Sequence, residues 1–170
     1  MTIHGAHPFL PPEDERSPVR RFRGRLPSPV SLWTSVHNGE RAGLTVSSML
    51  VANGEPGYIL GVLDPESDLW DAVRGSGRAV VTILDDGHRG LADAFGYVAP
   101  APGGPFRLGT WDETEWGPAL SDTTWAGCVV ADTDPPSLGW GLQVRLEIAH
   151  VSIGPDSSAL VHRRGRYTAL

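Results

Sequence analysis

The feature that most constrains the fold of this chain is a strict alternation of apolar and polar residues over positions 142–148. Apolar side chains hold the even positions and polar side chains hold the odd ones: Leu142, Val144, Leu146 and Ile148 against Gln143, Arg145 and Glu147. A period of two places one set in the core and the other in solvent. We therefore predict a long half-buried strand here.

Shorter segments of the same kind indicate that most of the chain is built of strands. Two of them, 30–37 and 41–50, are separated by Asn38-Gly39-Glu40. Asn-Gly between two such runs predicts a tight hairpin, because both residues accept positive φ. Further strands are expected at 57–63, 78–84 and 159–162, the last followed by a turn and an extension through Tyr167.

Two short helices and one long loop interrupt these strands. Ser67 is a suitable N-cap for one helix, and a second is expected at 88–95. Residues 96–126 are rich in proline and glycine and carry three tryptophans, so they are predicted to form a loop or lid with little regular structure. The fold class that follows is mainly β (α+β): an antiparallel barrel, closed or nearly so, of about six or more strands with two or more short helices.

Length and composition point to one globular domain. The chain has 170 residues, of which 40% are hydrophobic, and this is enough for a single core. Residues 1–18 carry four prolines and several acids, so we expect a flexible or extended arm before a domain over 19–170. A basic run follows at Arg20, Arg21, Arg23 and Arg25. Such a run is more often a solvated lead-in to a strand than an anion site.

Charge and cysteine content limit the partners and the compartment. The formal net charge of −6 argues against nucleic acid and anionic membranes as partners. The single cysteine, Cys128, permits no intrachain disulfide and lies in an apolar run where we expect it to be buried. The sequence shows no signal-peptide pattern and no apolar stretch long enough to span a bilayer, so a cytoplasmic protein is expected.

Several classes of catalytic site are missing from the sequence. It has no G-x-S-x-G elbow and no P-loop, and Gly75-Ser76-Gly77 precedes a strand, whereas a dinucleotide fingerprint follows one. His4 and His7 lack further ligands at suitable spacing, so no metal site is predicted. His150 shares the parity of Ile148, which favours a core histidine over a catalytic base. The sequence therefore predicts no catalytic side chain.

Four blocks in a fixed order carry a resemblance to a known family. They are GLTVSS at 43–48, DPESDLWDAV at 64–73, RAVVTIL at 78–84 followed by GLADAF at 90–95, and LVHRRGRYTAL at 160–170. In this order they resemble the flavin reductase family, whose fold is the FMN-binding split barrel. The resemblance covers about residues 22–170 and implies a split β-barrel.

The resemblance also implies a set of binding residues. The segment that lies along the flavin ring in the family matches Leu44, Thr45, Val46, Ser47 and Ser48. Small residues there let a flat ring approach the backbone, whose peptide groups bind the polar ring edge. Ser67 matches the position that takes the flavin phosphate, at a helix N-terminus where free N–H groups favour an anion. Phe95 matches a residue near the flavin, and His162 and Tyr167 match residues near the nicotinamide nucleotide and the exposed flavin face.

The sequence departs from the family pattern at two places. Asp64, Glu66 and Asp68 surround Ser67, and carboxylates repel a phosphate unless they turn outward or an arginine intervenes. The nearby candidates for such an arginine are Arg74, Arg78 and Arg89. The second departure follows the serines, where VANGEPG replaces the family's usual S-L-x-P-P.

The activity that the resemblance implies is NAD(P)H-dependent reduction of FMN or FAD, by a homodimer that can serve a separate partner monooxygenase. Other interpretations stay open from the residues alone. Ser47 and Ser48 can simply end a strand, Phe95 can be a core residue, and His162 and Tyr167 can merely seal the barrel. The alternative function is a non-catalytic barrel that binds flavin, haem or another planar ligand, and a third is a barrel without any ligand.

Overall fold

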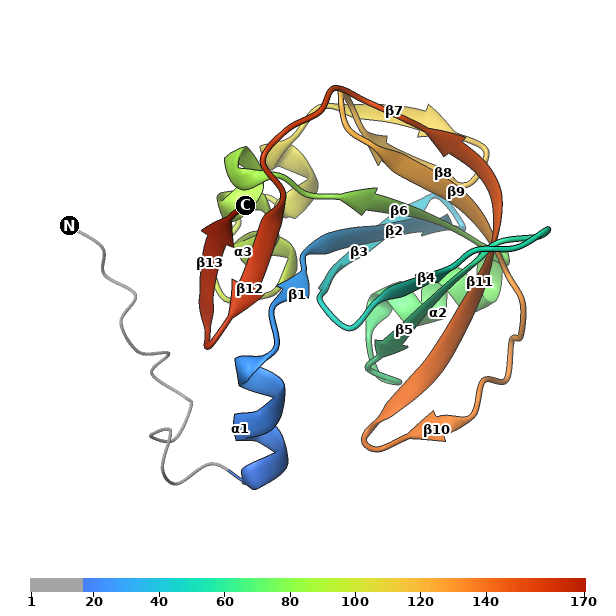
Figure 1. Ribbon diagram of the computed structural model, residues 1–170. Coiled ribbons are helices and arrows are strands. Elements are labelled where there is room, and N and C mark those ends of the chain that lie inside the picture. Colours follow the sequence, from blue (N-terminus) through green and yellow to red (C-terminus); the bar gives the residue numbers. More distant parts are fainter. Residues whose placement is uncertain (1–16) are drawn as a thin grey trace.

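The computed structural model describes residues 17–170, so His4, His7 and nearly all of the expected arm lie outside the described residues. Figure 1 shows a strongly curled sheet, with a small sheet beside it at the end where both α1 and the C-terminus lie. The helices are α1 (Pro18–Arg25), α2 (Asp68–Ser76) and α3 (Arg89–Phe95). Within residues 17–170, no helix is long and apolar enough to cross a membrane.

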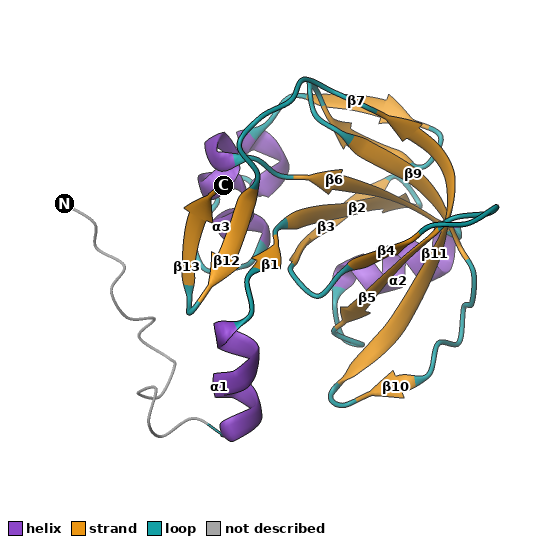
Figure 2. Cartoon of the chain, viewed as in Figure 1, coloured by secondary structure: helices purple, strands orange, loops and turns teal. Residues whose placement is uncertain are grey.

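Eight strands form the main sheet, and the neighbours within it are antiparallel. Its order is β3 (Glu40–Val46), β2 (Ser31–His37), β6 (Arg78–Ile83), β9 (Trp125–Val130), β11 (Gly141–Ser152), β5 (Tyr58–Leu63) and β4 (Leu50–Ala52), with β10 (Ser137–Leu138) paired to β11. The predicted hairpin joins β2 to β3, and Asn38 and Gly39 have φ values of 51° and 80°. The mainly β fold class is confirmed, and Figure 2 shows how far strands outnumber helices.

The sheet curls without closing, and its split lies between β3 and β4. The strand predicted over 41–50 is interrupted, because β3 ends at Val46 and β4 begins at Leu50. These two strands are the opposite edges of the eight-stranded sheet, and Ser47, Ser48 and Met49 connect them. The apolar alternation fails at the point where the chain leaves one edge of the sheet for the other.

Each face of the sheet carries its own apolar layer. On the inner face, α2 fills the barrel, where its Leu69 packs with Trp33 of β2. On the outer face, α3 covers β2 and β3, and its Phe95 packs with Leu32 of β2. Trp33 and Leu32 are neighbours that point to opposite faces, as a period of two requires. Both predicted helices exist, and they lie on opposite faces of the sheet.

The prediction that residues 96–126 have little regular structure is wrong. They contain a 3-10 turn at Pro105–Leu108, the hairpin of β7 (Trp111–Thr114) and β8 (Gly117–Leu120), and the start of β9. All of β8 is buried, and the Thr34 hydroxyl of β2 donates to the Pro118 carbonyl at 2.6 Å. Proline and glycine hid this strand from the pattern, because both are rare inside strands. The segment forms a second layer outside the sheet.

The interpretation of the arginine run as a lead-in to a strand is also wrong, because these residues form α1. The Ser17 hydroxyl accepts a hydrogen bond from the Arg20 N–H at 3.3 Å, and Pro18 occupies the first turn, where no N–H is needed. The arginines of α1 are exposed, as a solvated run should be. A small sheet follows, formed by β1 (Ser28–Pro29), β12 (Leu160–Arg163) and β13 (Arg166–Ala169).

Candidate functional site

The split in the sheet leaves backbone groups unpaired along the expected flavin-binding segment. Within residues 17–170, β3 pairs with another strand on one side only. In an edge strand, alternate N–H and C=O groups point away from the sheet. In the segment Leu44–Val46, the N–H and C=O groups of Thr45 are therefore the ones directed into the split, where a planar polar edge can bind them, because those of Leu44 and Val46 face β2.

The side chains of this segment are directed away from the split. Leu44 and Val46 face the barrel interior and pack in the same apolar cluster as Trp33. Thr45 faces the opposite side, and its hydroxyl donates to the Ala92 carbonyl of α3 at 2.8 Å. The fold occupies these three side chains, so a ligand along β3 would contact the strand through its backbone.

The two serines that follow β3 have different surroundings. The Ser48 hydroxyl accepts a hydrogen bond from the Val62 N–H at 3.1 Å and donates to the Val62 carbonyl at 2.9 Å. It thus extends the pairing of β5 beyond the start of β4. Ser47 is half-buried, and within the described residues its hydroxyl has no hydrogen-bond partner. Of the two hydroxyls, that of Ser47 is the one free to bind a ligand.

Ser67 caps α2, and this role engages its hydroxyl. The oxygen accepts from the Trp70 N–H at 3.2 Å and donates to the Asp64 carbonyl at 2.7 Å. The Asp64 carboxylate accepts a hydrogen bond from the Glu66 N–H at 2.9 Å, and Asp68 lies in the first helical turn. An anion here would be held by free backbone N–H groups of α2, close to three exposed carboxylates.

The structure places none of the three candidate arginines beside Ser67. Arg74 lies in the last turn of α2, at the opposite end of the helix from its cap. Arg78 pairs with Glu115 at 3.7 Å, and Arg89 pairs with Asp86. The acidic character of the Ser67 turn is therefore uncompensated by these side chains.

Phe95 lies in the outer apolar layer and is 1% exposed. Its ring meets those of Phe106 and Trp111 edge-on, with centroids 4.9 and 5.8 Å away. The ring also lies against Gly43, where an added Cβ would be 2.6 Å from a ring carbon. Phe95 thus supports β3 from behind the candidate segment and offers almost no surface to a ligand.

His162 and Tyr167 form a pair across the β12–β13 hairpin. They are opposite each other in the register, and their rings meet at 67° with centroids 5.6 Å apart. Burial and the charge of Arg23 lower the pKa of His162, against a smaller opposing effect of Asp93. Burial raises the pKa of Tyr167, and the charge and hydrogen bond of Asp93 raise it further. The pair therefore stays neutral around pH 7.

Helix α3 connects this pair to the candidate segment of β3. One residue, Ala92, accepts the hydrogen bond from Thr45, and the next residue, Asp93, is close enough for its charge to act on the pKa of Tyr167. Asp93 was not among the predicted residues, although it lies in the LADAF block on the polar side of the expected helix. The signal that could have identified Asp93 is an acidic residue on a short helix whose other face is apolar.

Two further predictions from single residues have different outcomes. Cys128 is fully buried as predicted, and burial raises the pKa of its thiol to about 12. The prediction of a core His150 is wrong, since its side chain is exposed and stacks on Trp116 with centroids 5.2 Å apart. A bulge between Ile148 and His150 shifts the register of β11 against β9 and reverses the parity.

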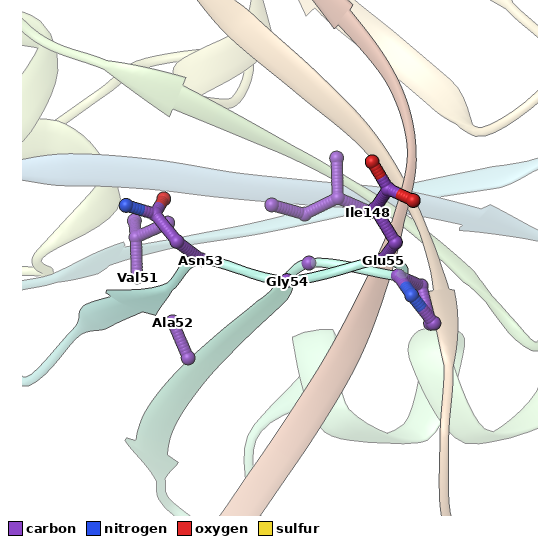
Figure 3. Close-up of a pocket in the computed structure, with 8 residues that line it drawn as sticks. Val51, Ala52, Asn53, Gly54, Glu55 and Ile148 are labelled. Atoms are coloured by element: carbon purple, nitrogen blue, oxygen red, sulfur yellow. The ribbon is translucent and has the colours of Figure 1, made fainter.

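Two surface hollows lie outside these candidate residues. One is formed by residues 51–57 at the β4–β5 turn together with Ile148, and Figure 3 shows Asn53 and Glu55 on this turn. A second lies between the start of α3 and residues 107–110. Neither is lined by Ser47, His162 or Tyr167. Within residues 17–170, no three His, Cys, Asp or Glu side chains cluster as metal ligands would.

Comparison with known proteins identifies the family to which this chain is similar. FMN reductase (NADH) RutF 1 of Methylorubrum extorquens is 34% identical over 104 residues, which are 61% of this chain and 51% of that protein. The chain thus spans about half the length of this curated relative. Among solved structures, nitrilotriacetate monooxygenase component B from Mycobacterium thermoresistibile has a TM-score of 0.80 at 26% identity, over 89% of this chain and 84% of that one.

The flavin reductase HpaC, solved in complex with NADP+, has a TM-score of 0.77 at 21% identity, over 89% of this chain and 96% of that one. It therefore shares the fold described above. The model of the flavin reductase like domain matches residues 23–170, which include β3, the cap of α2, α3 and the terminal hairpin. This match covers most of the sequence, and the chain belongs to the flavin reductase-like family.

Proposed function

We propose that this protein is an NAD(P)H-dependent flavin reductase that binds FMN or FAD along the split between β3 and β4. The observation that carries the proposal is the open edge of β3, which ends at the free Ser47 hydroxyl. Curated relatives named FMN reductase (NADH) support the same activity and favour NADH as the reductant.

The β3 edge fits a flavin ring for a physical reason. A flat ring with a polar pyrimidine edge needs several donors and acceptors at close range, and an edge strand offers them through its backbone. Leu44, Thr45 and Val46 turn their side chains to the two faces of the sheet, so no side chain blocks the edge. The Ser47 hydroxyl adds one more polar group at the end of the strand.

The terminal hairpin suits the nicotinamide side of the site. A bound flavin accepts a hydride at N5 from the nicotinamide, so the protein must align two rings at roughly 3–3.5 Å. His162 and Tyr167 are half-buried and neutral, and the charge of Asp93 acts on Tyr167. We propose that these two residues position the nicotinamide and that neither of them transfers a proton.

The remaining parts of the proposal concern assembly and phosphate. Ser67 would contribute to a flavin phosphate site through the N–H groups of α2, since its own hydroxyl caps the helix. We propose a cytoplasmic homodimer that supplies reduced flavin to a partner monooxygenase. The component of a monooxygenase among the structural relatives supports the last part.

A steady-state assay of NADH and NADPH oxidation with FMN as acceptor tests the activity, and a fluorescence titration measures FMN affinity. Ser47→Ala should weaken FMN binding about fivefold, which is about 1 kcal/mol for one lost hydrogen bond. Ser121→Ala is the matched control, because this buried hydroxyl also lacks a partner but lies away from β3. A folded protein without flavin-dependent oxidation would refute the function, and an unchanged Ser47→Ala affinity would refute that contact alone.

A further inference from the structure

Half of the basic residues of this chain gather at one place. Helix α1 carries four of them and the β12–β13 turn carries three, out of 14 in the whole sequence: Arg20, Arg21, Arg23 and Arg25, with Arg163, Arg164 and Arg166. We call these seven residues the arginine surface. The chain as a whole has a net charge of −6, so this concentration of positive charge runs against the overall balance.

Hydrogen bonds hold the two segments of the arginine surface together. The Arg164 N–H donates to the Gly24 carbonyl at 2.8 Å, and the Arg163 Nε donates to the Arg25 carbonyl at 3.2 Å. Figure 1 shows the turn of the β12–β13 hairpin directed toward α1. The fold thus assembles the surface from residues that are about 140 positions apart in the sequence.

The positive charge of this surface is not neutralised within the described residues. All seven arginines are exposed, and the ion pairs among residues 17–170 involve none of them. Guanidinium groups at such density repel one another, and a polyanion would relieve the repulsion. Arginine is also the side chain best suited to bind phosphate, because its planar fork makes two parallel hydrogen bonds.

The surface adjoins the hairpin pair assigned to the nicotinamide. Arg163 and Arg166 are opposite each other in the register, one step beyond His162 and Tyr167, and a strand rises about 3.3 Å per residue. Arg23 of α1 is close enough for its charge to act on His162. Successive side chains of a strand alternate between its faces, so a dinucleotide whose nicotinamide lies at the hairpin pair would reach Arg163 and Arg166 by passing around the end of the hairpin.

Two exposed apolar side chains share α1 with the arginines. Val19 and Phe22 of α1 are 79% and 71% exposed, and three-residue spacing puts them on one face of the helix. An aromatic ring exposed on the same helix as guanidinium groups suits a base that carries phosphates better than it suits an acidic peptide. From these observations we propose that the arginine surface binds the phosphate groups of the nicotinamide dinucleotide, an inference that rests on the proposed function.

The test compares NADPH and NADH in a double variant, Arg23→Gln with Arg166→Gln. Neither side chain makes a hydrogen bond within the described residues, and glutamine keeps the helix propensity of α1. We expect the KM for NADPH to rise at least tenfold, with kcat changed much less. Arg145→Gln is the matched control, since this exposed arginine lies on β11 beside Tyr58. Arg23→Lys with Arg166→Lys should recover part of the affinity, because the charges remain.

The pattern of changes identifies the phosphate. A rise for NADPH alone assigns the surface to the 2′-phosphate, and an equal rise for NADH and NADPH assigns it to the diphosphate. Unchanged KM values for both dinucleotides in a folded double variant would overturn the inference. An acidic protein would then be the better candidate to bind the surface.

A direct titration with NADP+ separates this inference from the proposed function. If the wild-type protein binds NADP+ in a manner that depends on the two arginines but reduces no flavin, the function fails and the inference stands. If it reduces flavin with NADH and the variants change neither KM nor NADP+ affinity, the inference fails alone.

Discussion

Two places on this protein could hold a phosphate, and they are opposite in charge. At the Ser67 turn, the hydroxyl is engaged in capping α2 and three carboxylates surround it. At the arginine surface, seven guanidinium groups are exposed and none forms an ion pair within residues 17–170. A helix N-terminus is a general anion site, but its partial charge of about half a unit is small beside three full negative charges. As possible phosphate sites, the two places therefore differ more clearly in local net charge than in their position within a sequence motif.

Charge reversal at the arginine surface should produce the largest effect. Arg23→Glu with Arg166→Glu changes two local charges by two units each, which should cost roughly 2 kcal/mol of dinucleotide binding, or about thirtyfold in KM at low salt. Higher ionic strength should shrink the effect, because these charges are exposed. Steady-state kinetics at two salt concentrations measures both. A loss that is equal at low and high salt would point to misfolding instead of electrostatics.

The second prediction tests what Ser67 does. Ser67→Ala should lower the free energy of unfolding by about 1 kcal/mol, because the first turn of α2 loses its cap, with a fall in Tm of about 2–4 °C. Ser67→Thr keeps the cap and serves as the control. FMN and riboflavin affinities should fall together or not at all, since the hydroxyl is already engaged. A selective loss of FMN binding would show that the hydroxyl contacts the phosphate.

The third prediction concerns the carboxylates of the same turn. Glu66→Gln with Asp68→Asn should tighten FMN severalfold at low salt if the phosphate lies at the α2 N-terminus, since each exposed charge pair costs about 1 kcal/mol or less. Riboflavin, which lacks the phosphate, should respond much less. Parallel titrations of the two ligands measure the difference. Equal responses would remove the flavin phosphate from this turn.

The smallest effect is a pKa change that links the arginine surface to the hairpin pair. Burial and Arg23 lower the pKa of His162, so Arg23→Gln should raise that pKa, as an NMR titration would measure. A folded-state pKa below the unfolded value of about 6.5 means that the unfolded chain binds the proton more readily. Stability from this group is therefore present above about pH 6.5 and declines as the pH falls through that value. Arg23→Gln should reduce the decline, and an unchanged His162 pKa would place Arg23 too far away to act.

Much of the fold could be predicted because its signals are local. The Asn38-Gly39 hairpin, the alternation of β11 and the cap of α2 each depend on a few neighbouring residues. Helix α1 also had local signals, a serine cap followed by proline. Its run of arginines was nevertheless interpreted as a lead-in to a strand. Here the signal for a helix start was present in the sequence but was given too little weight.

Other errors came from contacts that no local pattern contains. Residues 117–120 read as a loop because of Gly117 and Pro118, yet β8 is stabilised by burial against β2 and β6. The face of His150 depends on a bulge opposite Gly127, and a single unpaired residue reverses every parity beyond it. Tertiary packing overrides weak local propensity in both cases.

For the candidate site, the sequence by itself determined that the strand pattern breaks at Ser47 and Ser48, and that a serine opens the helix after β5. Only the tertiary structure decided which hydroxyls are free, because Ser48 bonds Val62 across the loop and Ser67 bonds its own helix. It also decided that Thr45 of β3 bonds α3, and that arginines about 140 positions apart form one charged surface. Spacing along a chain encodes the period of a strand or a helix, whereas the partner of a polar group depends on which distant segment folds against it.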